Sequence, residues 1–481
     1  MLTHEKASDT FDRIKKLTSA DEVEVFLSGG KHSLTRFANN TIHQNVAEAN
    51  HTISVRTAFG GRTARASTNK FDDESLRRVV EASESLAKVQ HSDPDLLPMP
   101  DARETGGDAD EAEGQTARAT HTPAQTGTNP ATPSRHFAVT AAITPEQRAE
   151  GVKHIVAVAE HHRLTTAGTY SSNEWVEGIF NSRGVNKWHE QTSAEISITM
   201  IGEDSSGWQK ANSPDAVNLD PKTLAETAAK KAIDTAQPVE LPPGKYTVIL
   251  EPAAALDIVG FMFWDYSGTS ILDQRSFLSG RIGTKVFGEN ITIWDDVNHP
   301  LQTGSPFDGE GMTRRRLPLV ENGVVTRVVY ARATAARMKR SEYKDKAGPV
   351  EATGHGFLLP NEAGEMPVNI VFAPPTHPQS LEQMISSTER GVLVTRLWYI
   401  REVEPYEKIC TGMTRDGTFY IENGRVKHGI RNFRFNESLI HMLSNVAAMS
   451  LPVRASGEES IDMVVPAMKI DDFNFTEVTK F

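Results

Sequence analysis

The stretch DEVEVFLSGGKHSLTRFANNTIHQNVAEANHTISVRTAFGGRTARA, residues 21–66, carries the pattern that decides the fold of the N-terminal part. Apolar and polar residues alternate along much of it, with interruptions at the turn signals Asn39-Asn40 and Gly60-Gly61. We expect separate half-buried strands at 21–28, 33–38, 41–45, 51–58 and 62–66. A helical pattern then begins at the N-cap residue Asp72. Strands followed by a covering helix predict an α+β domain with an antiparallel sheet and covering helices.

Composition changes abruptly at His91. Between His91 and His136 the only large aliphatic residues are Leu96, Leu97 and Met99, and the rest is mainly Thr, Ala, Gly, Pro, Asp and Glu. Such a stretch cannot bury enough apolar surface to offset its ordering entropy. We interpret residues 91–136 as a disordered insertion within an N-terminal α+β domain that spans residues 1–240.

Helix and hairpin signals organise the rest of the chain. Thr144-Pro145 with Gln147 predicts a helix that runs to about His162, and Asp220-Pro221 predicts another over 221–236. From Lys245 onward strand patterns dominate, with turn sequences at 321–323, 416–417 and 422–424. Asn-Gly between alternating residues is a strong hairpin signal. The fold class is therefore predicted to be α+β, with a C-terminal domain, residues 241–481, dominated by antiparallel β-sheet.

Charge and composition restrict the classes of partner. The chain has 51 basic and 63 acidic residues, a net charge of −12, and no concentrated basic stripe, which argues against binding a nucleic-acid backbone. The longest apolar stretch, 246–264, is interrupted by Glu251, Pro252 and Asp257, so we expect a strand and a buried helix and no membrane span. The start of the chain lacks a signal-peptide pattern, and Cys410 is the single cysteine. A cytoplasmic location is the expectation.

Several stretches, in a shared order and spacing, resemble one protein family. They are RFANNTIHQNVAEANHTISVRTAFGGRTARAST (36–68), NSRGVNKWHEQTSAEISITM (181–200), FDGEGMTRRRLPLVENGVVTRVVYARATAARM (307–338), TGHG (353–356) and GTFYIENGRVKHGIRNFRF (417–435). The third is the most specific, since it matches an acidic D-x-E-G element followed by ENGV and an x-T-A helix start. The chain resembles the TldD/PmbA, or modulator of DNA gyrase, peptidase family over nearly its whole length outside 91–136.

The resemblance also implies which branch of the family the chain is similar to. Catalytic subunits of the family use an H-E-x-x-x-H helix, whose histidines bind zinc while the glutamate activates water. The helix expected after the strand YTVILEP reads PAAALDIVGFMFWDY (252–266) and contains no histidine. The third family ligand is a C-terminal cysteine, and the matching LPVRASG (451–457) has none. The resemblance implies a PmbA-like chain with no catalytic residue, metal or cofactor of its own.

What the resemblance implies about partners follows from that branch. Zinc is expected in a TldD-like partner subunit, with which this chain forms a heterodimeric metallopeptidase that acts on unstructured peptides. Neither nucleic acid nor a membrane is an expected partner.

Possible groove or loop residues are Asp308, Glu310, Gly311, Gly354 and His355. Asp308 and Glu310 have the spacing of paired carboxylates, but no nucleophile or metal ligand accompanies them in the sequence, so we favour a structural loop. His355 lies between two glycines that permit unusual backbone angles, and a structural turn is favoured over a cleft residue. Cys410 has no histidine near it in sequence, which favours a buried small apolar residue over a nucleophile.

Two functions of other classes remain open. One is a stand-alone module that binds peptides or proteins without protease activity, and the other is a peptidase with an unrecognised site, for which the sequence offers no support. An adjacent gene that encodes a family member with H-E-x-x-x-H would favour the heterodimer over the stand-alone module.

Overall fold

The computed structural model describes residues 2–106 and 133–479 of the 481-residue chain. Its first part is one antiparallel six-stranded sheet in the order β3-β2-β1-β4-β5-β6. The strands are β1 (Glu22–Ala38), β2 (Thr41–Phe59), β3 (Arg62–Thr68), β4 (Thr165–Asn181), β5 (Asn186–Ile201) and β6 (Ser206–Ser213). The helices are α1 (His4–Leu17), α2 (Asp73–Val89), α4 (Ala138–Ala141), α5 (Pro145–His161) and α6 (Pro221–Asp234), with a short 3₁₀ turn at Ala216–Asn218.

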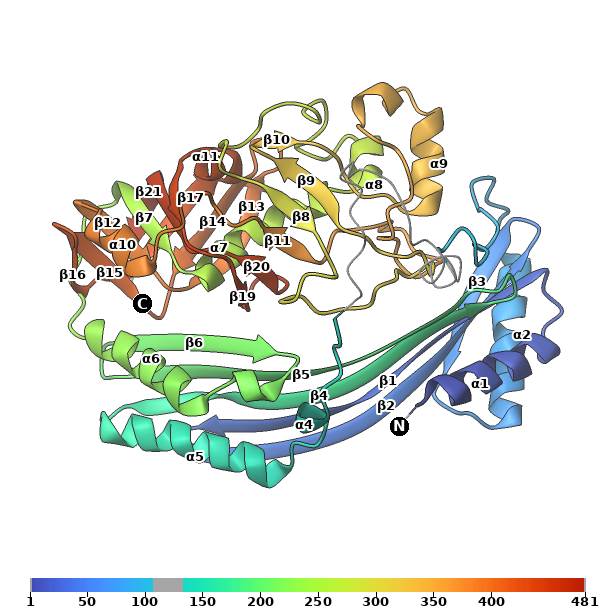
Figure 1. Ribbon diagram of the computed structural model, residues 1–481, viewed down its shortest axis with the longest axis horizontal. Coiled ribbons are helices and arrows are strands. Elements are labelled where there is room, and N and C mark those ends of the chain that lie inside the picture. Colours follow the sequence, from blue (N-terminus) through green and yellow to red (C-terminus); the bar gives the residue numbers. More distant parts are fainter. Residues whose placement is uncertain (1, 107–132, 480–481) are drawn as a thin grey trace, which may run out of the picture.

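Helices cover the outer face of this sheet at both ends (Figure 1). At one end α1 and α2 pack on Val25, Leu27 and Val55 of the sheet, and at the other α5 and α6 pack on Phe37 and Ile198. The predicted helix starts are confirmed: Asp72 and Asp220 accept amide hydrogen bonds at their N-caps, and Thr144 with Gln147 forms a capping box. The apolar side chains buried in these two clusters therefore hold the helices against the two ends of the long sheet.

The expected division of residues 21–58 into separate strands was wrong. β1 runs unbroken for 17 residues and β2 for 19, so the stretches around Gly29-Gly30 and 46–50 continue the same two strands. Their alternation fades because the middle of both strands lies beyond the helices, where residues 28–30 of β1 are half-buried and residues 47–52 of β2 are exposed. Glycine is required there, since a Cβ on Gly30 would lie 2.3 Å from the Glu174 carbonyl oxygen of β4.

The C-terminal part contains two further sheets. One has six strands in the order β10-β9-β8-β11-β20-β19, and the other has nine, β13-β14-β17-β21-β7-β12-β15-β16 with β18 beside β21. The strands of the first are β8 (Ile293–Asp295), β9 (Leu317–Glu321), β10 (Val324–Val325), β11 (Ile370–Phe372), β19 (Val453–Ala455) and β20 (Met463–Val465). Those of the second are β7 (Gly244–Leu250), β12 (Arg390–Val394), β13 (Leu397–Glu404), β14 (Ile409–Thr414), β15 (Thr418–Glu422), β16 (Arg425–Gly429), β17 (Phe433–Ser438), β18 (Val446–Met449) and β21 (Met468–Val478).

Most strand pairs of these two sheets are antiparallel, which confirms the predicted fold class, while β7–β12 and β11–β20 are parallel. The turn signals at 321–323 and 422–424 close the hairpins β9–β10 and β15–β16. The helices are α7 (Pro252–Val259), α8 (Gly268–Leu272), α9 (Arg332–Arg340), α10 (Leu381–Ser386) and α11 (Leu439–Ser444), with 3₁₀ segments η2 (Gly260–Asp265) and η3 (Lys344–Lys346). Within the described residues, no helix is long and apolar enough to cross a membrane.

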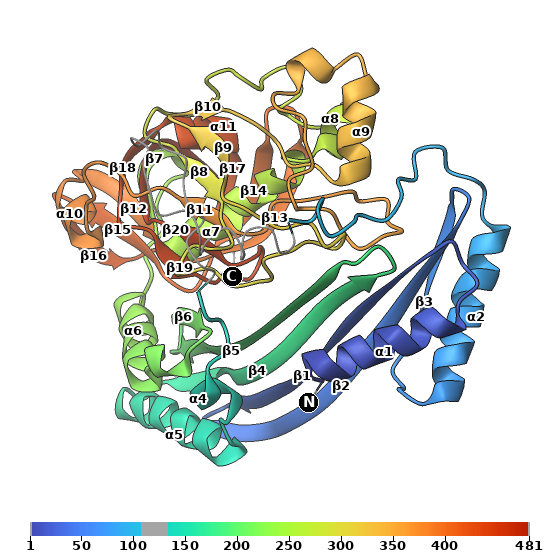
Figure 2. The same ribbon diagram turned by 45° about the vertical axis from the view of Figure 1, so that its right-hand side comes forward.

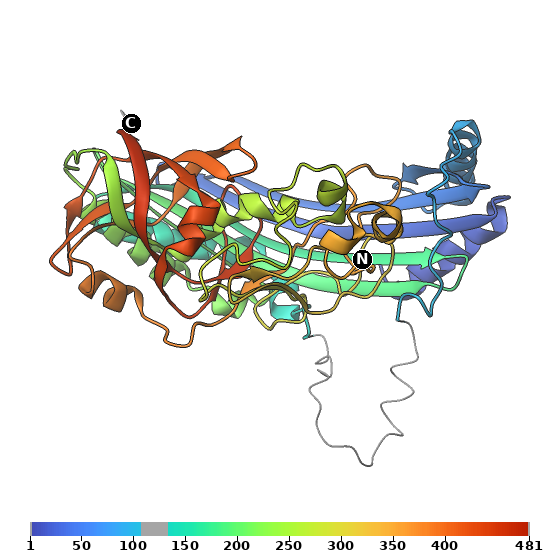
Figure 3. The same cartoon turned by 90° about the horizontal axis from the view of Figure 1, so that it is seen from above.

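The C-terminal sheets lie over the inner face of the long sheet, whose strands run beneath them along the long axis of the molecule (Figures 2 and 3). Side chains join the two parts at several points. Arg65 Nε donates to the Leu359 carbonyl at 2.6 Å, and Lys210 Nζ donates to the Gly457 carbonyl at 2.9 Å. A small apolar cluster of Ile179, Val185 and Phe307 also spans the junction.

The ends of the predicted insertion differ from the expectation. Met99 is buried and its amide donates to Glu22, while Arg135 is buried and donates to the Val297 and His299 carbonyls. The prediction of disorder was therefore wrong for 91–106 and 133–136, because a few residues with specific contacts hold these ends on the body. The remaining part of that prediction concerns residues 107–132, which lie outside the described residues.

Candidate functional site

The segment from Pro252 to Asp265 occupies the place in which the family resemblance expects a metal-binding helix. β7 is an inner strand of the nine-stranded sheet and leads directly into α7, which begins with Pro252 at its first turn. Residues 254–259 of α7 are fully buried, as the apolar sequence predicts. The chain then tightens into η2, and Trp264 near its end is 56% exposed. The prediction of a buried helix is thus confirmed for α7 and wrong for Trp264.

The loop 457–460 packs directly against this segment. Asp257 Oδ1 accepts hydrogen bonds from the amides of Glu458 and Glu459 at 3.0 and 2.9 Å. A Cβ on Gly457 would lie 2.1 Å from Asp257 Oδ1, and a Cβ on Gly260 would lie 1.8 Å from Ser460 Oγ. The two regions that the sequence resemblance matches to zinc-binding segments therefore meet in this fold, but they meet through glycines, a serine and one carboxylate.

Asp257 is the charged residue of this contact. Its side chain is fully buried, and burial raises its pKa to about 7 although the amides of Glu459 and Glu458 act in the opposite direction. Its Oδ2 atom has no hydrogen-bond partner among the residues that the structure describes. A single acidic residue in an otherwise apolar helix was the sequence signal for this position.

Two clefts of about 400 Å³ each lie on either side of Phe261 and Trp264. We call these two side chains the aromatic ridge. The first cleft also contains Asp265, Lys408 and Tyr406, and the second contains Gly260, Met366 and Ile461. Trp264 presents apolar surface that the described part of the chain leaves uncovered, and apolar surface between two clefts is a candidate for binding.

A buried group of charged side chains forms part of the wall of the first cleft. Lys408 is 3% exposed and contacts the carboxylates of Asp265 and Glu402. Burial raises the pKa of Asp265, and the Lys408 ammonium opposes that shift. Burial alone would lower the pKa of Lys408, but its two carboxylate partners outweigh burial and raise it. Lys408 therefore stays charged and holds η2 against the strand β14.

The five residues singled out from the sequence come together elsewhere, at the junction of the two parts. Asp308 accepts hydrogen bonds from the amides of Gly356, Glu310 and Met312 at 2.7 to 2.9 Å. Gly354 has φ +74°, and a Cβ there would lie 2.7 Å from the Thr313 carbonyl oxygen. Gly311 has φ +82° and faces Val185 of the N-terminal part. The turns 308–312 and 353–356 are thus one packed unit.

The two carboxylates of that unit have structural partners. Burial, together with the charge of Glu310, raises the pKa of Asp308 to about 7. Glu310 accepts from the Arg332 amide at 3.0 Å, and Glu365 accepts from the Ala331 amide at 3.1 Å. Glu310 and Glu365 therefore bind unpaired amides at the start of α9, which is the usual role of acidic residues at a helix N-terminus. Glu310 also lines a cleft of about 410 Å³ between α9 and residues 93–97.

His355 lies in a buried ionic cluster that the sequence did not reveal. Its Nε2 is 3.1 Å from Asp295 Oδ1, and Arg314 contacts the same oxygen at 3.0 Å. Asp295 Oδ2 accepts from the Val368 and Asn369 amides, both at 2.8 Å. Burial alone would raise the pKa of Asp295, but Arg314 and His355 outweigh burial and hold it well below its ordinary value. The cluster joins three distant segments and is enclosed.

Cys410 is fully buried, and burial raises the pKa of its thiol to about 12. It therefore stays protonated, in agreement with its interpretation as a small apolar residue. Among residues 2–106 and 133–479, no group of three or more His, Cys, Asp and Glu is arranged to hold a metal ion. The side chains present around α7 and the 457–460 loop do not fit a zinc centre, because zinc requires three or four closely placed nitrogen, sulfur or oxygen ligands.

The fold and these sites define a two-part α+β protein of the type seen in several solved structures. TldE from Thermococcus kodakarensis has a TM-score of 0.80 at 19% identity, and the alignment covers 98% of this chain and 100% of that one. A putative modulator of a DNA gyrase from Thermotoga maritima MSB8 has a TM-score of 0.81 at 18% identity, with the same coverage. These likenesses establish the fold.

The chain belongs to the PmbA/TldD metallopeptidase family. Family domain 1 matches residues 23–87, the central domain matches 140–235, and the C-terminal domain matches 243–477. Metalloprotease PmbA of Escherichia coli O157:H7 is 21% identical over 431 residues, which cover 87% of this chain and 85% of the relative. An uncharacterized protein of Methanocaldococcus jannaschii is 32% identical over 180 residues, which cover 36% of this chain and 41% of that protein.

The raised pKa of Asp257 gives a testable pH dependence. A folded-state pKa of about 7 means that the folded chain keeps a proton that the unfolded chain releases near pH 4. The free energy of unfolding therefore falls as pH rises from about 4 to about 7, by at most about 1.4 kcal/mol for each tenfold fall in proton concentration. Asp257→Asn is neutral throughout, so the decline between pH 4.5 and 8 should be smaller in urea denaturation.

The matched control for this measurement is Asp12→Asn, on the exposed side of α1. It should leave the pH profile unchanged. Asp308 titrates in the same window, so part of the decline should remain in Asp257→Asn. A profile of Asp257→Asn that coincides with that of the unchanged chain would show that Asp257 is not held protonated.

Proposed function

We propose that this chain is the subunit without its own zinc centre in a two-subunit peptidase of the PmbA/TldD family. Its partner is a zinc-bearing family member that cleaves unstructured peptides. This chain helps to enclose the chamber in which the partner cleaves the peptide. It contacts the substrate, and it contributes no catalytic residue. The net charge of −12 has the same sign as a nucleic-acid backbone, so it gives no support for nucleic acid as the substrate.

One observation carries the proposal. The helix α7 with η2 and the loop 457–460 lie in contact, as two ligand-bearing segments of a metal site would, yet their contact is filled by Gly260, Ser460 and Asp257. No histidine occurs in residues 252–266, and no cysteine or histidine occurs in residues 451–461. The side chains of Ser460 and Asp257 occupy the closest approach of the two segments, and neither belongs to a set of three or four zinc ligands.

The aromatic ridge suggests how the chain would contact an extended peptide. Phe261 and Trp264 separate two clefts, so consecutive side chains of a peptide lying across the ridge could enter one cleft and then the other. Apolar contact to an exposed tryptophan depends little on sequence, which suits substrates that share only an unfolded main chain. Glu458 and Glu459 line the second cleft, whose lining within the described residues contains no lysine or arginine, so this cleft favours basic side chains, whereas Arg275 and Lys408 balance Asp265 and Glu402 in the first cleft.

The test is co-purification from the native organism with a tag on this chain, followed by metal analysis and hydrolysis of an unstructured peptide. We expect a zinc-bearing family member in near-equal amount, about one zinc per pair, and hydrolysis by the pair. Trp264→Ala should preserve the pair and raise KM for the peptide, whereas Val217→Ala, an exposed apolar residue outside both clefts, should not. Recovery of this chain alone from cells that contain such a zinc-bearing member would contradict the proposal.

A further inference from the structure

The edge of the long sheet at β2 has a segment that no other strand among residues 2–106 and 133–479 covers. β3 pairs with β2 only over Ile53–Phe59, so the preceding part of β2 pairs with β1 alone. A bulge at His43 interrupts the register, and residues 44–52 beyond it are regular. We call residues 44–52 the free edge. All of them except Val46 are exposed, and at nine residues the free edge is longer than an average strand.

The direction of the main-chain groups follows from the register. The Ser182 amide donates to the Val23 carbonyl, so odd-numbered residues of β1 direct their main-chain groups to β4 and even-numbered residues direct theirs to β2. The partners of those even residues in β2 are also even, as in Gly30 with Asn50. The odd residues Asn45, Ala47, Ala49 and His51 therefore direct their N–H and C=O groups outward.

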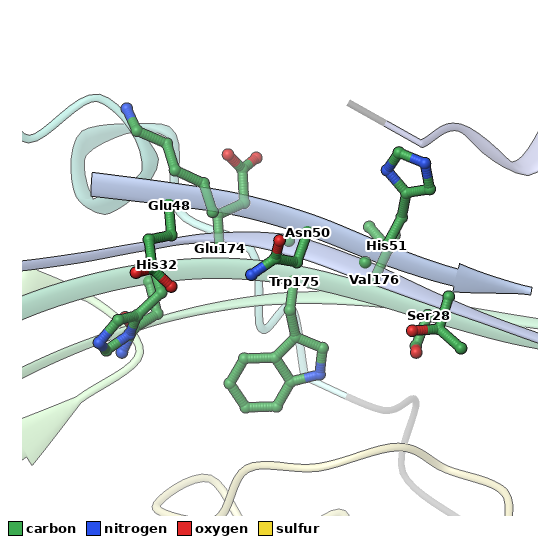
Figure 4. Close-up of a pocket in the computed structure, with 13 residues that line it drawn as sticks. Ser28, His32, Glu48, Asn50, His51, Glu174, Trp175 and Val176 are labelled. Carbon is green, nitrogen blue, oxygen red and sulfur yellow. The ribbon is translucent and has the colours of Figure 1, made fainter. Parts of the chain in front are cut away.

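Side chains leave this row of main-chain groups open. Figure 4 shows that Glu48 and His51 leave the sheet on opposite faces, and Trp175 of β4 points toward the C-terminal part. Two of the four outward-directed positions are alanine, so an added strand would meet little steric hindrance. Edge strands are usually protected by charged side chains, above all lysine, by proline or by a bulge; residues 44–52 contain Glu48 as their one charged residue, and the bulge at His43 lies just outside them.

Charge and the position of β3 restrict the registers in which this edge can pair with itself. An antiparallel two-fold pairing must place odd residues opposite odd residues. Centred on Ala47, it sets Asn45 opposite Ala49 of the other copy and Glu48 opposite Val46. Centred on Glu48, it would set two glutamates directly opposite each other, which is destabilising. Centred on Ala49, it would run into Ile53, whose outward groups already pair with Thr68 of β3.

We propose that the free edge is a dimerisation surface at which β2 pairs antiparallel with β2 of a second copy of this chain, centred on Ala47. The two six-stranded sheets then form one continuous sheet. This contact uses the N-terminal sheet and not the aromatic ridge, so it leaves the surface of the proposed peptidase function free. It does not depend on a zinc-bearing partner.

The test uses the purified full chain alone, by sedimentation velocity over a concentration series. We expect a dimer that dissociates on dilution. Ala47→Pro removes an outward-directed N–H without touching the β1–β2 ladder, because proline is tolerated on edge strands. Loss of the two central hydrogen bonds in the dimer should weaken dimerisation by about tenfold or more. Ala47→Val keeps the N–H and should still dimerise.

Hydrogen exchange of the unchanged chain gives a second readout that does not depend on a variant folding. The outward-directed amides of Asn45, Ala47 and Ala49 should be protected at high chain concentration and should lose protection on dilution, whereas the amides of Val46, Glu48 and Asn50, which face β1, should stay protected at both. A monomer at about 100 μM, far above the micromolar range in which a biologically useful dimer forms, would overturn the proposal. So would an Ala47→Pro chain that dimerises as tightly as Ala47→Val. Protection that appears only when an extended peptide is added to a monomer would overturn it too, and would assign the edge to peptide binding instead.

Discussion

A chain that carries Gly260→His, Phe261→Glu and Asp265→His is expected to lose about 5 kcal/mol of unfolding free energy and to show no zinc-dependent peptidase activity. These changes give the spacing H-E-x-x-x-H. A side chain at Gly260 collides with Ser460 Oγ, since even a Cβ would lie 1.8 Å from it. Loss of Asp265 removes a carboxylate partner of the buried Lys408.

The local geometry also opposes metal binding by this variant. Positions 260 and 265 are the first and last residues of η2, and they face different neighbours. In the structure one faces Ser460 and the other faces Lys408. Urea denaturation and hydrolysis of an unstructured peptide with added zinc are the measurements. A stable, zinc-dependent peptidase would mean that this segment is a dormant active site.

A rescue variant separates the steric cause from a general loss of packing. Gly260→Ala alone should destabilise the chain, because its Cβ meets Ser460 Oγ at 1.8 Å and Ser460 Cβ at 2.4 Å. Ser460→Gly removes both atoms, so the double variant should recover a large part of the loss. A double variant whose loss equals the sum of the two single losses would show that the 457–460 loop does not press on Gly260.

Asp295→Ala is expected to cost about 4 kcal/mol, because it leaves Arg314 and His355 buried beside each other without their shared carboxylate. It also leaves the Val368 and Asn369 amides without their acceptor. Urea denaturation at neutral pH measures the loss. The cluster holds the strands β8 and β11 to the turn that contains His355, so the effect should spread over the C-terminal part.

The matched control is Glu289→Ala, which breaks the exposed pair with Lys285. Exposed ion pairs contribute little because water already solvates both charges. The control should therefore be indistinguishable from the unchanged chain. A loss of unfolding free energy for Asp295→Ala as small as that for Glu289→Ala would contradict the view that this buried cluster stabilises the fold.

Local chemistry made much of the fold predictable from the sequence. Asp72, Thr144 and Asp220 cap the helices they were expected to cap, because a capping bond joins residues two or three positions apart. The hairpins at Asn322 and Asn423 were predictable for the same reason, since both asparagines adopt the positive φ that their turns require. The unbroken strands β1 and β2 were not, because their exposed middle is held by main-chain pairing that leaves no apolar pattern.

The candidate sites depend on contacts between distant residues, and these the sequence did not reveal. Asp257 meets the amides of Glu458 and Glu459 across some two hundred positions, and Asp295 gathers Arg314 and His355 from separate turns. The absence of histidine from 252–266 could be read directly, whereas the contact of that segment with residues 457–460 needed the fold. Trp264 was expected to be buried because apolar periodicity does not tell a core from an exposed ridge.

The zinc content of the isolated chain tests most directly whether it lacks a metal centre. The purified chain is dialysed against buffer with micromolar zinc, then against metal-free buffer, and zinc is measured per chain alongside a zinc-bearing family subunit treated in the same way. We expect about one zinc in the reference subunit and no stoichiometric zinc in this chain, because the segments that the resemblance matches to zinc-binding segments meet through Gly260, Ser460 and Asp257, and neither 252–266 nor 451–461 contains a histidine or cysteine. About one tightly held zinc per chain, lost when particular histidines are replaced, would contradict the assignment of this chain as the subunit without zinc.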